Sequence, residues 1–152
     1  RVGLQDAEYM PAPIKFEAGT QRVSQAVAFA AAVCYLQHLG MENVEAWEHE
    51  LGARLVEGVQ KIEGVRLLGP TAPTKRAGLV ALAIEGVHPH DVGQLLDTQG
   101  IAVRVGHHCA QPLHRCAGVT ASTRASTYIY NTTEDVAAFL KALAEVRPYF
   151  GL

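Results

Sequence analysis

The chain has 152 residues, of which 49% are hydrophobic and 18% charged, a composition typical of a folded globular domain rather than a disordered segment. Its formal net charge is −2 without a dense run of Lys or Arg, so nucleic-acid and anionic-membrane binding have little electrostatic support. The longest apolar stretch, 26–36, is too short to cross a bilayer, and three cysteines favour a reducing, cytoplasmic compartment over a disulfide framework.

The first third of the chain predicts a loop followed by two helices. Residues 1–20 have no clear period and are punctuated by Pro and Gly, which is typical of an extended loop. From 21 to 39 the apolar residues fall near one broad face, which predicts a helix ended by Gly40 and carrying Cys34 as a core residue. The same spacing predicts a second helix over about 42–62.

The rest of the chain predicts strands that alternate with helices. Short apolar or alternating runs indicate four strands, over 65–68, 78–84, 101–105 and 123–130. A helix is expected over 90–99. Another begins after Thr132, which can form a capping box with Asp135, and is expected to end at Pro148. We therefore predict an α+β (α/β) domain, with one small sheet covered by helices and with leading helices that pack partly on something outside the chain.

Cys109 is the thiol whose surroundings favour chemistry. A free thiol has a pKa of about 8.5, so only a small fraction is thiolate at neutral pH. Arg104, His107 and His108 precede Cys109, and a short helix is expected to open at Pro112. Cationic neighbours and helix N-termini raise the thiolate fraction, so this loop suits a nucleophile.

Two other interpretations of the Cys109 loop stay open at this stage. Cys109 could be a small hydrophobic loop residue. It could also belong to a metal site, although the possible ligands have no standard zinc spacing. Those ligands are His88, His90, His107, His108, Cys109, His114 and Cys116. Cys116 itself is expected in a turn near the surface, with a structural role.

Arg124 is the other side chain singled out by the sequence. It lies in a strand-like run, and an Arg that points from a sheet into a cleft can hold a carboxylate through two parallel hydrogen bonds. The alternative is a solvated or ion-paired Arg. Composition does not choose between them.

Three segments together resemble the SUF-type (group II) cysteine desulfurases of the class V aminotransferase family. Residues 101–112, which contain Arg104-Val105-Gly106-His107-His108-Cys109-Ala110, resemble the active-site loop of that family. Residues 16–20, Phe-Glu-Ala-Gly-Thr, resemble a second segment, and 124–126 with 130–132 resemble a third. They occur in family order, so the resemblance covers essentially the whole chain.

The resemblance implies a function and residue roles. The family consists of homodimeric enzymes dependent on pyridoxal 5'-phosphate (PLP) that convert L-cysteine to L-alanine and keep the sulfur as a persulfide for iron-sulfur cluster assembly. Cys109 would attack the substrate sulfur, Arg124 would bind the substrate carboxylate, and Arg104 would shape the same site. Gly19 and Thr20 match the segment that reaches the cofactor phosphate of the neighbouring subunit.

The resemblance also implies a partner. His90 matches a histidine that some members place on the zinc of a sulfur-acceptor protein of the SUF system. The histidines would then form a docking site for that partner rather than a metal site of this chain. No nucleic acid and no membrane are expected among the partners.

One family feature is missing. The lysine that holds the cofactor follows a histidine in the larger N-terminal domain, whereas none of Lys15, Lys61, Lys75 and Lys141 follows a histidine. We therefore interpret the chain as the C-terminal portion of the enzyme. Residues 1–20 would be an extended segment from the cofactor-domain side, and residues 21–152 the small C-terminal domain with its leading helices. Alone, the chain is expected to be inactive.

Two alternative functions remain at this stage. One is selenocysteine lyase, because selenocysteine has the same skeleton as cysteine. The other is a non-catalytic zinc-binding or sulfur-relay module that uses His88, His90 and the Cys109 loop.

Overall fold

The computed structural model describes residues 1–72 and 76–152, so Lys75 lies outside the described residues. The chain divides into two compact units, Arg1–Gly40 and Met41–Leu152. The domain boundary expected after residue 20 stays a prediction.

Unit 1 contains a loop and one long helix. The isolated bridge between Val2 and Ala7 and the 3-10 helix η1, Ile14–Phe16, interrupt the predicted loop. Helix α1 spans Val23–Leu39, close to the predicted 21–39. Gly40 ends it with φ +85° and donates its N–H to the Gln37 carbonyl, as a C-terminal glycine does.

The predicted core position of Cys34 is wrong, because its side chain is exposed. Helix α1 has no buried residue, and no side chain is buried within residues 1–40, all of which the structure describes. The apolar residues of α1 surround the helix, with Val23, Val27 and Phe29 all exposed. A sequence pattern identifies the buried face of a helix only when the opposite face is polar, and α1 has no such polar face.

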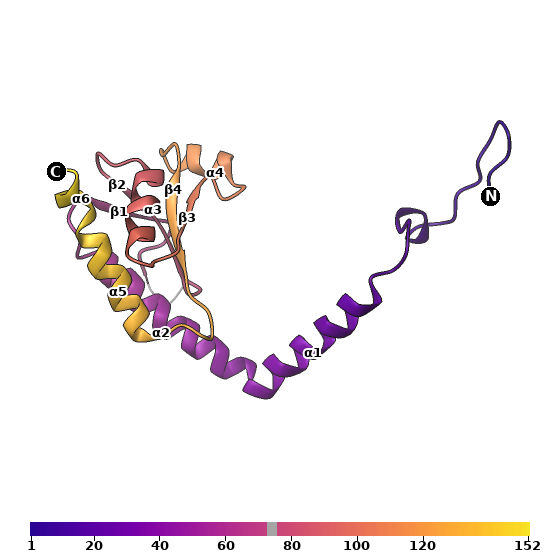
Figure 1. Ribbon diagram of the computed structural model, residues 1–152, viewed down its shortest axis with the longest axis horizontal. Coiled ribbons are helices and arrows are strands. Elements are labelled where there is room, and N and C mark those ends of the chain that lie inside the picture. The colour runs from indigo at the N-terminus through magenta and orange to yellow at the C-terminus, as the bar shows by residue number, and fades with distance from the viewer. Residues whose placement is uncertain (73–75) are drawn as a thin grey trace. The chain divides into compact units, whose positions relative to one another are not determined.

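Unit 2 is a four-stranded antiparallel sheet with helices packed on it (Figure 1). The strand order is β1-β2-β4-β3. The elements are α2 Met41–Val59, β1 Val65–Leu68, β2 Leu79–Ile84, α3 Pro89–Thr98, β3 Arg104–Gly106, α4 Gln111–Cys116, β4 Ser122–Ser126, α5 Thr133–Ala144 and α6 Val146–Tyr149. The predicted mixed fold, a small sheet covered by helices, is confirmed.

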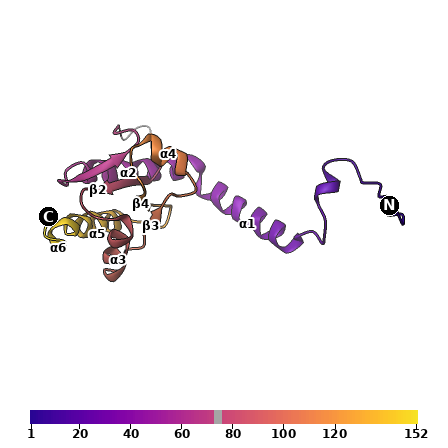
Figure 2. The same ribbon diagram turned by 90° about the horizontal axis from the view of Figure 1, so that it is seen from above.

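Alternation along β2 gives the sheet one apolar face. Val80, Leu82 and Ile84 are buried, and they join a single cluster with side chains of α2, α3 and α5. Figure 2 shows α3, α5 and α6 gathered on one side of the strands. Ala81 and Ala83 point to the opposite face, where the register pairs Ala81 with Arg124. The core helices α2, α3 and α5 therefore lie on the other face, and the arginine-bearing face is covered at one end by α4, whose His114 contacts Ser122 of β4.

Strands β3 and β4 are shorter than predicted. Residues 101–103 lie before β3, because the N–H of Ile101 donates to the Leu96 carbonyl and keeps the chain in the turn after α3. Strand β4 ends at Ser126, where its pairing with β2 runs out at Leu79. Beyond it, the Asn131 side chain accepts the Tyr128 N–H and turns the chain toward α5.

The predicted capping box at α5 is confirmed, and the predicted end of that helix is wrong. Thr132 Oγ1 accepts the Asp135 N–H at 3.2 Å, and Asp135 Oδ2 accepts the Thr132 N–H at 2.9 Å. Helix α5 ends at Ala144, whereas Pro148 lies in the first turn of α6. Proline is tolerated there because a first-turn residue needs no intrahelical N–H donor.

In the part of the chain that the structure describes, no single helix is both long and apolar enough to span a membrane. Helices α1 and α2 meet the length and composition requirement only as a broken pair.

Candidate functional site

The face of the sheet opposite the hydrophobic core carries three arginines from three strands. Arg66 of β1 pairs with Ala83, and Arg124 of β4 pairs with Ala81 on one side and Arg104 of β3 on the other. Arg66 donates to the Ala117 carbonyl at 2.5 Å. In the described residues the one ion pair joins Arg54 to Glu50, so no carboxylate balances these three charges there. The face is therefore electropositive.

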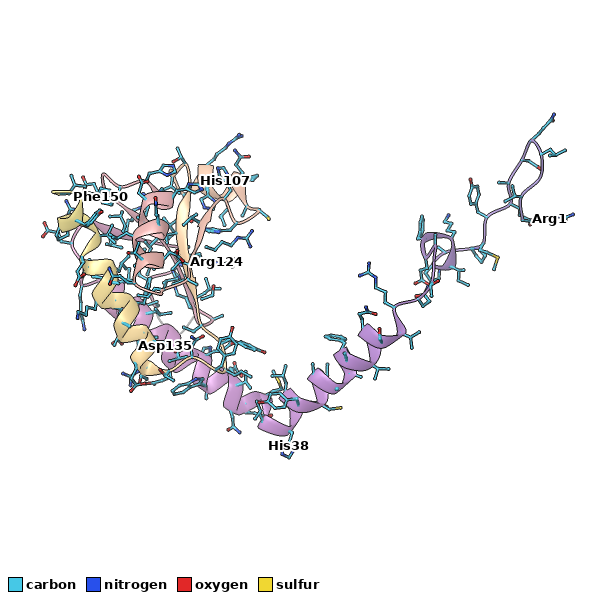
Figure 3. All side chains as sticks on the ribbon, in the orientation of Figure 1. Arg1, His38, His107, Arg124, Asp135 and Phe150 are labelled. Atoms are coloured by element: carbon cyan, nitrogen blue, oxygen red, sulfur yellow. The ribbon has the colours of Figure 1, made fainter. Side chains whose placement is uncertain are left out.

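Arg104 and Arg124 lie directly opposite each other, an arrangement that disfavours the sheet unless an anion shares the two charges. The Nε of Arg124 is buried and has no hydrogen-bond partner among the described residues. Figure 3 shows Arg124 at the strands, away from α5, which carries the labelled Asp135. A planar donor group with an unused N–H fits a carboxylate, which can accept two parallel hydrogen bonds.

The loop after β3 holds Cys109 in an unusual backbone conformation. His108 and Cys109 have φ +52° and +60°, the left-handed region that non-glycine residues seldom adopt. Such strain persists only where surrounding contacts impose it, and it concentrates at functional sites. The Cys109 thiol is exposed, and Arg104 Nη2 donates to its sulfur at 3.6 Å. Arg104, five residues before Cys109 in the sequence, therefore contacts the thiol in the structure.

The short helix predicted after Pro112 is α4, and Cys116 is its last residue. Cys116 is exposed, as its predicted surface position requires, although it lies in a helix rather than a turn. His107 is exposed as well, and Figure 3 shows it near the ends of strands β3 and β4.

Two histidines and a serine form a network beneath the thiol loop. His108 Nε2 lies 3.0 Å from Ser122 Oγ, and His114 Nε2 lies 2.9 Å from the same oxygen. His114 Nδ1 lies 2.9 Å from the Ala110 carbonyl oxygen. Burial lowers the pKa of His108, and the positive charges of Arg124, His114 and Arg104 lower it further, against an opposing hydrogen bond with the backbone of Ser122.

The sequence did not identify Ser122, and it identified His114 only as a possible metal ligand. Ser122 precedes Arg124 by two residues in β4, so strand alternation puts both on the same face. That relation was available from the sequence once the strand was known. The approach of His114 to Ser122 was not, because it depends on how α4 packs.

The histidines before α3 are arranged as a helix cap. His88 Nδ1 accepts the His90 N–H at 3.3 Å, and the two rings stack with centroids 5.1 Å apart. His90 is exposed at the start of α3. In residues 1–72 and 76–152 no group of three or more His, Cys, Asp or Glu side chains is arranged to hold a metal ion.

Gly19 and Thr20 lie in unit 1, both exposed. Gly19 has φ +95°, and no atom lies within 4 Å of the position that a Cβ would take. A glycine of this kind leaves its backbone open to close approach by a ligand. These two residues therefore fit a phosphate that binds through backbone N–H groups and a hydroxyl.

Known proteins similar to this chain share both its sequence and its fold. A probable cysteine desulfurase 2 of Mycobacterium leprae is 47% identical over 150 residues, which are 99% of this chain and 36% of that protein. A probable cysteine desulfurase of Streptomyces coelicolor is 45% identical over the same length. The chain thus spans about a third of the length of the curated relatives it matches.

Two solved structures of cysteine desulfurases superpose closely. The apo enzyme of Thermococcus onnurineus NA1 has a TM-score of 0.85 and 38% identity, over all of this chain and 37% of that one. The Escherichia coli enzyme CsdA, solved as an S-sulfonic acid, has a TM-score of 0.84 and 33% identity, over 98% of this chain and 36% of that one. The Aminotransferase class-V family matches residues 1–139, and the chain belongs to that family.

Proposed function

We propose that this chain supplies the sulfur-accepting part of a PLP-dependent cysteine desulfurase of the SUF type. The observation that carries the proposal is the contact between Arg104 and the Cys109 thiol at 3.6 Å, beside Arg124 with its unused buried Nε. Arg104 donates a hydrogen bond to the thiol sulfur, and the opposite arginine has a buried N–H available for a carboxylate. The similarity to cysteine desulfurases supports the same reaction.

The reaction transfers one sulfur atom from substrate to enzyme. The Cys109 thiolate attacks the sulfur of L-cysteine, forming an S–S bond as the substrate C–S bond breaks. The electron pair of the C–S bond stays with the substrate carbon, which takes up a proton to give L-alanine. Cys109 keeps the sulfur as a persulfide. Net, one cysteine and one enzyme thiol give one alanine and one enzyme persulfide.

Arg124 orients the substrate in this proposal. Its guanidinium binds the substrate carboxylate, and the positive charge of Arg104 assists from across the strand pair. Fixing the carboxylate aligns the substrate sulfur with the thiolate, which lowers the entropic part of the barrier.

Gly19 and Thr20 would hold the phosphate of the cofactor, and PLP, when bound, supplies the electron sink that weakens the C–S bond. No lysine of the chain follows a histidine, so these 152 residues alone are proposed to hold no cofactor covalently and to turn over no cysteine. A stable new absorbance band after adding PLP to the isolated chain would contradict this.

The sulfur would leave to an acceptor protein of the SUF system for iron-sulfur cluster assembly, from a homodimeric, cytoplasmic enzyme. His90 would enter the coordination of a zinc ion on that acceptor, because its ring is exposed at the start of α3. His90→Ala should lower sulfur transfer to a zinc-containing acceptor without lowering sulfur release to a small thiol. Equal losses in both assays would contradict the docking role.

A polypeptide of the relatives' length that contains these residues provides the test. It is given L-cysteine and PLP, and alanine and released sulfur are measured. Cys109→Ala should abolish sulfur transfer, whereas Cys116→Ala should leave it unchanged, since Cys116 is exposed but has no guanidinium contact among the described residues. Full sulfur transfer by Cys109→Ala would make the assignment wrong.

A further inference from the structure

Ser122 joins three segments that surround the thiol. Its hydroxyl, fully buried in β4, contacts His108 of the thiol loop and His114 of α4. His114 in turn contacts the Ala110 carbonyl, one residue after Cys109. The loop is therefore held on both sides of Cys109, at His108 and at Ala110.

The chemistry of the four groups fixes the direction of each hydrogen bond. A carbonyl oxygen only accepts, so the proton of His114 is on Nδ1. Because His114 is buried, its ring is favoured as the neutral form with one proton, so His114 Nε2 is bare and accepts the single Ser122 proton. The Ser122 oxygen, its own proton used, accepts the proton on His108 Nε2.

The His108 ring is thereby left with a bare Nδ1. That nitrogen is buried and has no partner in the part of the chain that the structure describes. The reverse direction would need a proton on both nitrogens of His114, which is buried. That positive charge would add to those of Arg124 and Arg104, and each of the three acts on His108. The reverse direction would also leave an N–H at His108 Nδ1 without an acceptor. Buried charges and orphaned N–H groups both cost free energy, so the neutral arrangement is favoured.

We infer that Ser122 and His114 are positioning residues, which lock His108 in its Nε2–H form and hold the Cys109 loop in its left-handed conformation beside Arg104. The inference rests on the proposed function, because it gives the loop a nucleophile to position. In this form, His108 Nδ1 carries no proton, so it can accept a proton or a hydrogen bond but cannot donate one. The contact between Arg104 and the Cys109 thiol then depends on the Ser122 hydroxyl of β4, because that hydroxyl holds the loop that carries the thiol.

The test is the tautomer of each histidine in the 152-residue chain, read at about pH 8 from the nitrogen NMR shifts of a histidine-labelled sample. The expected result is opposite tautomers, with the proton of His114 on Nδ1 and that of His108 on Nε2. The His114 result is the sharper one, because Nδ1–H is the minor form of free histidine in water. A proton on His114 Nε2, or on His108 Nδ1, would overturn the inference without any variant being made.

Variants test the positioning role through Cys109 alkylation, with exposed Cys116 as the internal reference. Ser122→Ala should let His108 exchange between tautomers and slow alkylation of Cys109 about 2- to 10-fold, the loss expected for one hydrogen bond. Ser122→Thr keeps the hydroxyl and should retain the Nε2–H form. Ser126→Ala, an exposed serine of the same strand, is the matched control.

A Ser122→Ala chain in which His108 stays locked and Cys109 reacts at the original rate would overturn the positioning role. These measurements use neither cysteine nor cofactor. A failure of the proposed desulfurase function would appear in sulfur transfer by Cys109→Ala, so the two failures are distinguishable.

Discussion

At the residue scale, two arginines and a strained loop surround the Cys109 thiol. Arg104 donates to the Cys109 sulfur, Arg124 lies opposite Arg104, and His108 carries a φ of +52° next to the thiol. Each feature disfavours folding when taken alone: like charges repel, and left-handed backbone is strained. In the proposed function the same features bind an anionic substrate and position the Cys109 thiol, so that function would oppose stability here.

The charge around His108 predicts a pH dependence of stability. Burial, then the charges of Arg124, His114 and Arg104, lower the pKa of folded His108, so the unfolded chain takes up a proton first as pH falls. The stability from neutral His108 is complete above about pH 6.5 and is lost as pH falls through the folded pKa. Urea unfolding at about pH 8 and about pH 5 should show a smaller loss in His108→Gln than in the unaltered chain.

The control for this experiment is His49→Gln, an exposed histidine of α2. It should keep the pH dependence of the unaltered chain. An unchanged pH dependence in His108→Gln would mean that His108 is not the group responsible.

The geometry of Arg124 predicts that lysine cannot replace it. In the longer polypeptide, Arg124→Lys keeps the charge but loses the planar pair of donors. We expect KM for L-cysteine to rise about 10- to 100-fold, the range for a charge-assisted hydrogen bond. Arg54→Lys, at an exposed arginine of α2, should leave KM unchanged. A normal KM in the Arg124→Lys enzyme would show that Arg124 does not bind the substrate carboxylate.

The sequence was informative about the residues of the proposed site that it singled out, and not about the residues that contact them. Cys109 and Arg104 are five residues apart, so their proximity follows from a strand entering a loop. The pairing of Arg104 with Arg124 depends on strand register, and the contact of His114 with Ser122 depends on helix packing. Both are tertiary facts that local pattern does not contain.

At the element scale, the packing of α2 against α5 depends on a missing side chain. A Cβ on Gly58 would fall well inside contact distance of three carbon atoms of Leu140. Glycine disfavours a helix interior by about 1 kcal/mol relative to alanine, so its presence in α2 is explained by close packing. The helical spacing of the apolar residues predicts the extent of α2 within a few residues, but it does not predict this contact.

Gly58→Ala should therefore destabilise unit 2 by about 1–3 kcal/mol, although alanine is the better helix former. The measurement is the free energy of urea unfolding. In a Leu140→Ala background the same substitution should become neutral or stabilising, because the overlap is gone. Equal destabilisation in both backgrounds would contradict the packing explanation.

The cap of α5 gives a second prediction at this scale. Thr132→Ala removes the hydroxyl that accepts the Asp135 N–H and should cost about 1 kcal/mol of unfolding free energy. Thr120→Ala, at an exposed threonine between α4 and β4, should cost less than about 0.5 kcal/mol. Equal losses in the two variants would show that the cap adds nothing. Thr132 and Asp135 were predictable because a capping box is a local pattern.

At the scale of the whole molecule, the core belongs to one part of the chain. Every buried apolar side chain among the described residues lies between Val44 and Val146, within unit 2. Helix α1 is rich in apolar residues, and its sequence therefore predicted a buried face. In the structure none of its residues is buried. Local pattern shows which residues can be buried, and only the assembled structure shows what buries them.

Unit 2 should therefore fold without unit 1. Residues 41–152 should unfold within about 0.5 kcal/mol of the full chain, in one cooperative transition. The comparison uses urea titrations of both chains followed by circular dichroism and by Trp47 fluorescence. A loss of more than about 1 kcal/mol on removing residues 1–40 would contradict an independent core.

The identity of the sulfur-bearing residue is tested most directly by mass spectrometry of the longer polypeptide after reaction with L-cysteine and PLP. We expect the Cys109 peptide to gain the mass of one sulfur atom, a gain that a reducing thiol reverses, while the Cys116 peptide stays unmodified. Alanine formation with the sulfur on Cys116, or with no sulfur on either cysteine, would contradict the assignment of Cys109 as the persulfide carrier.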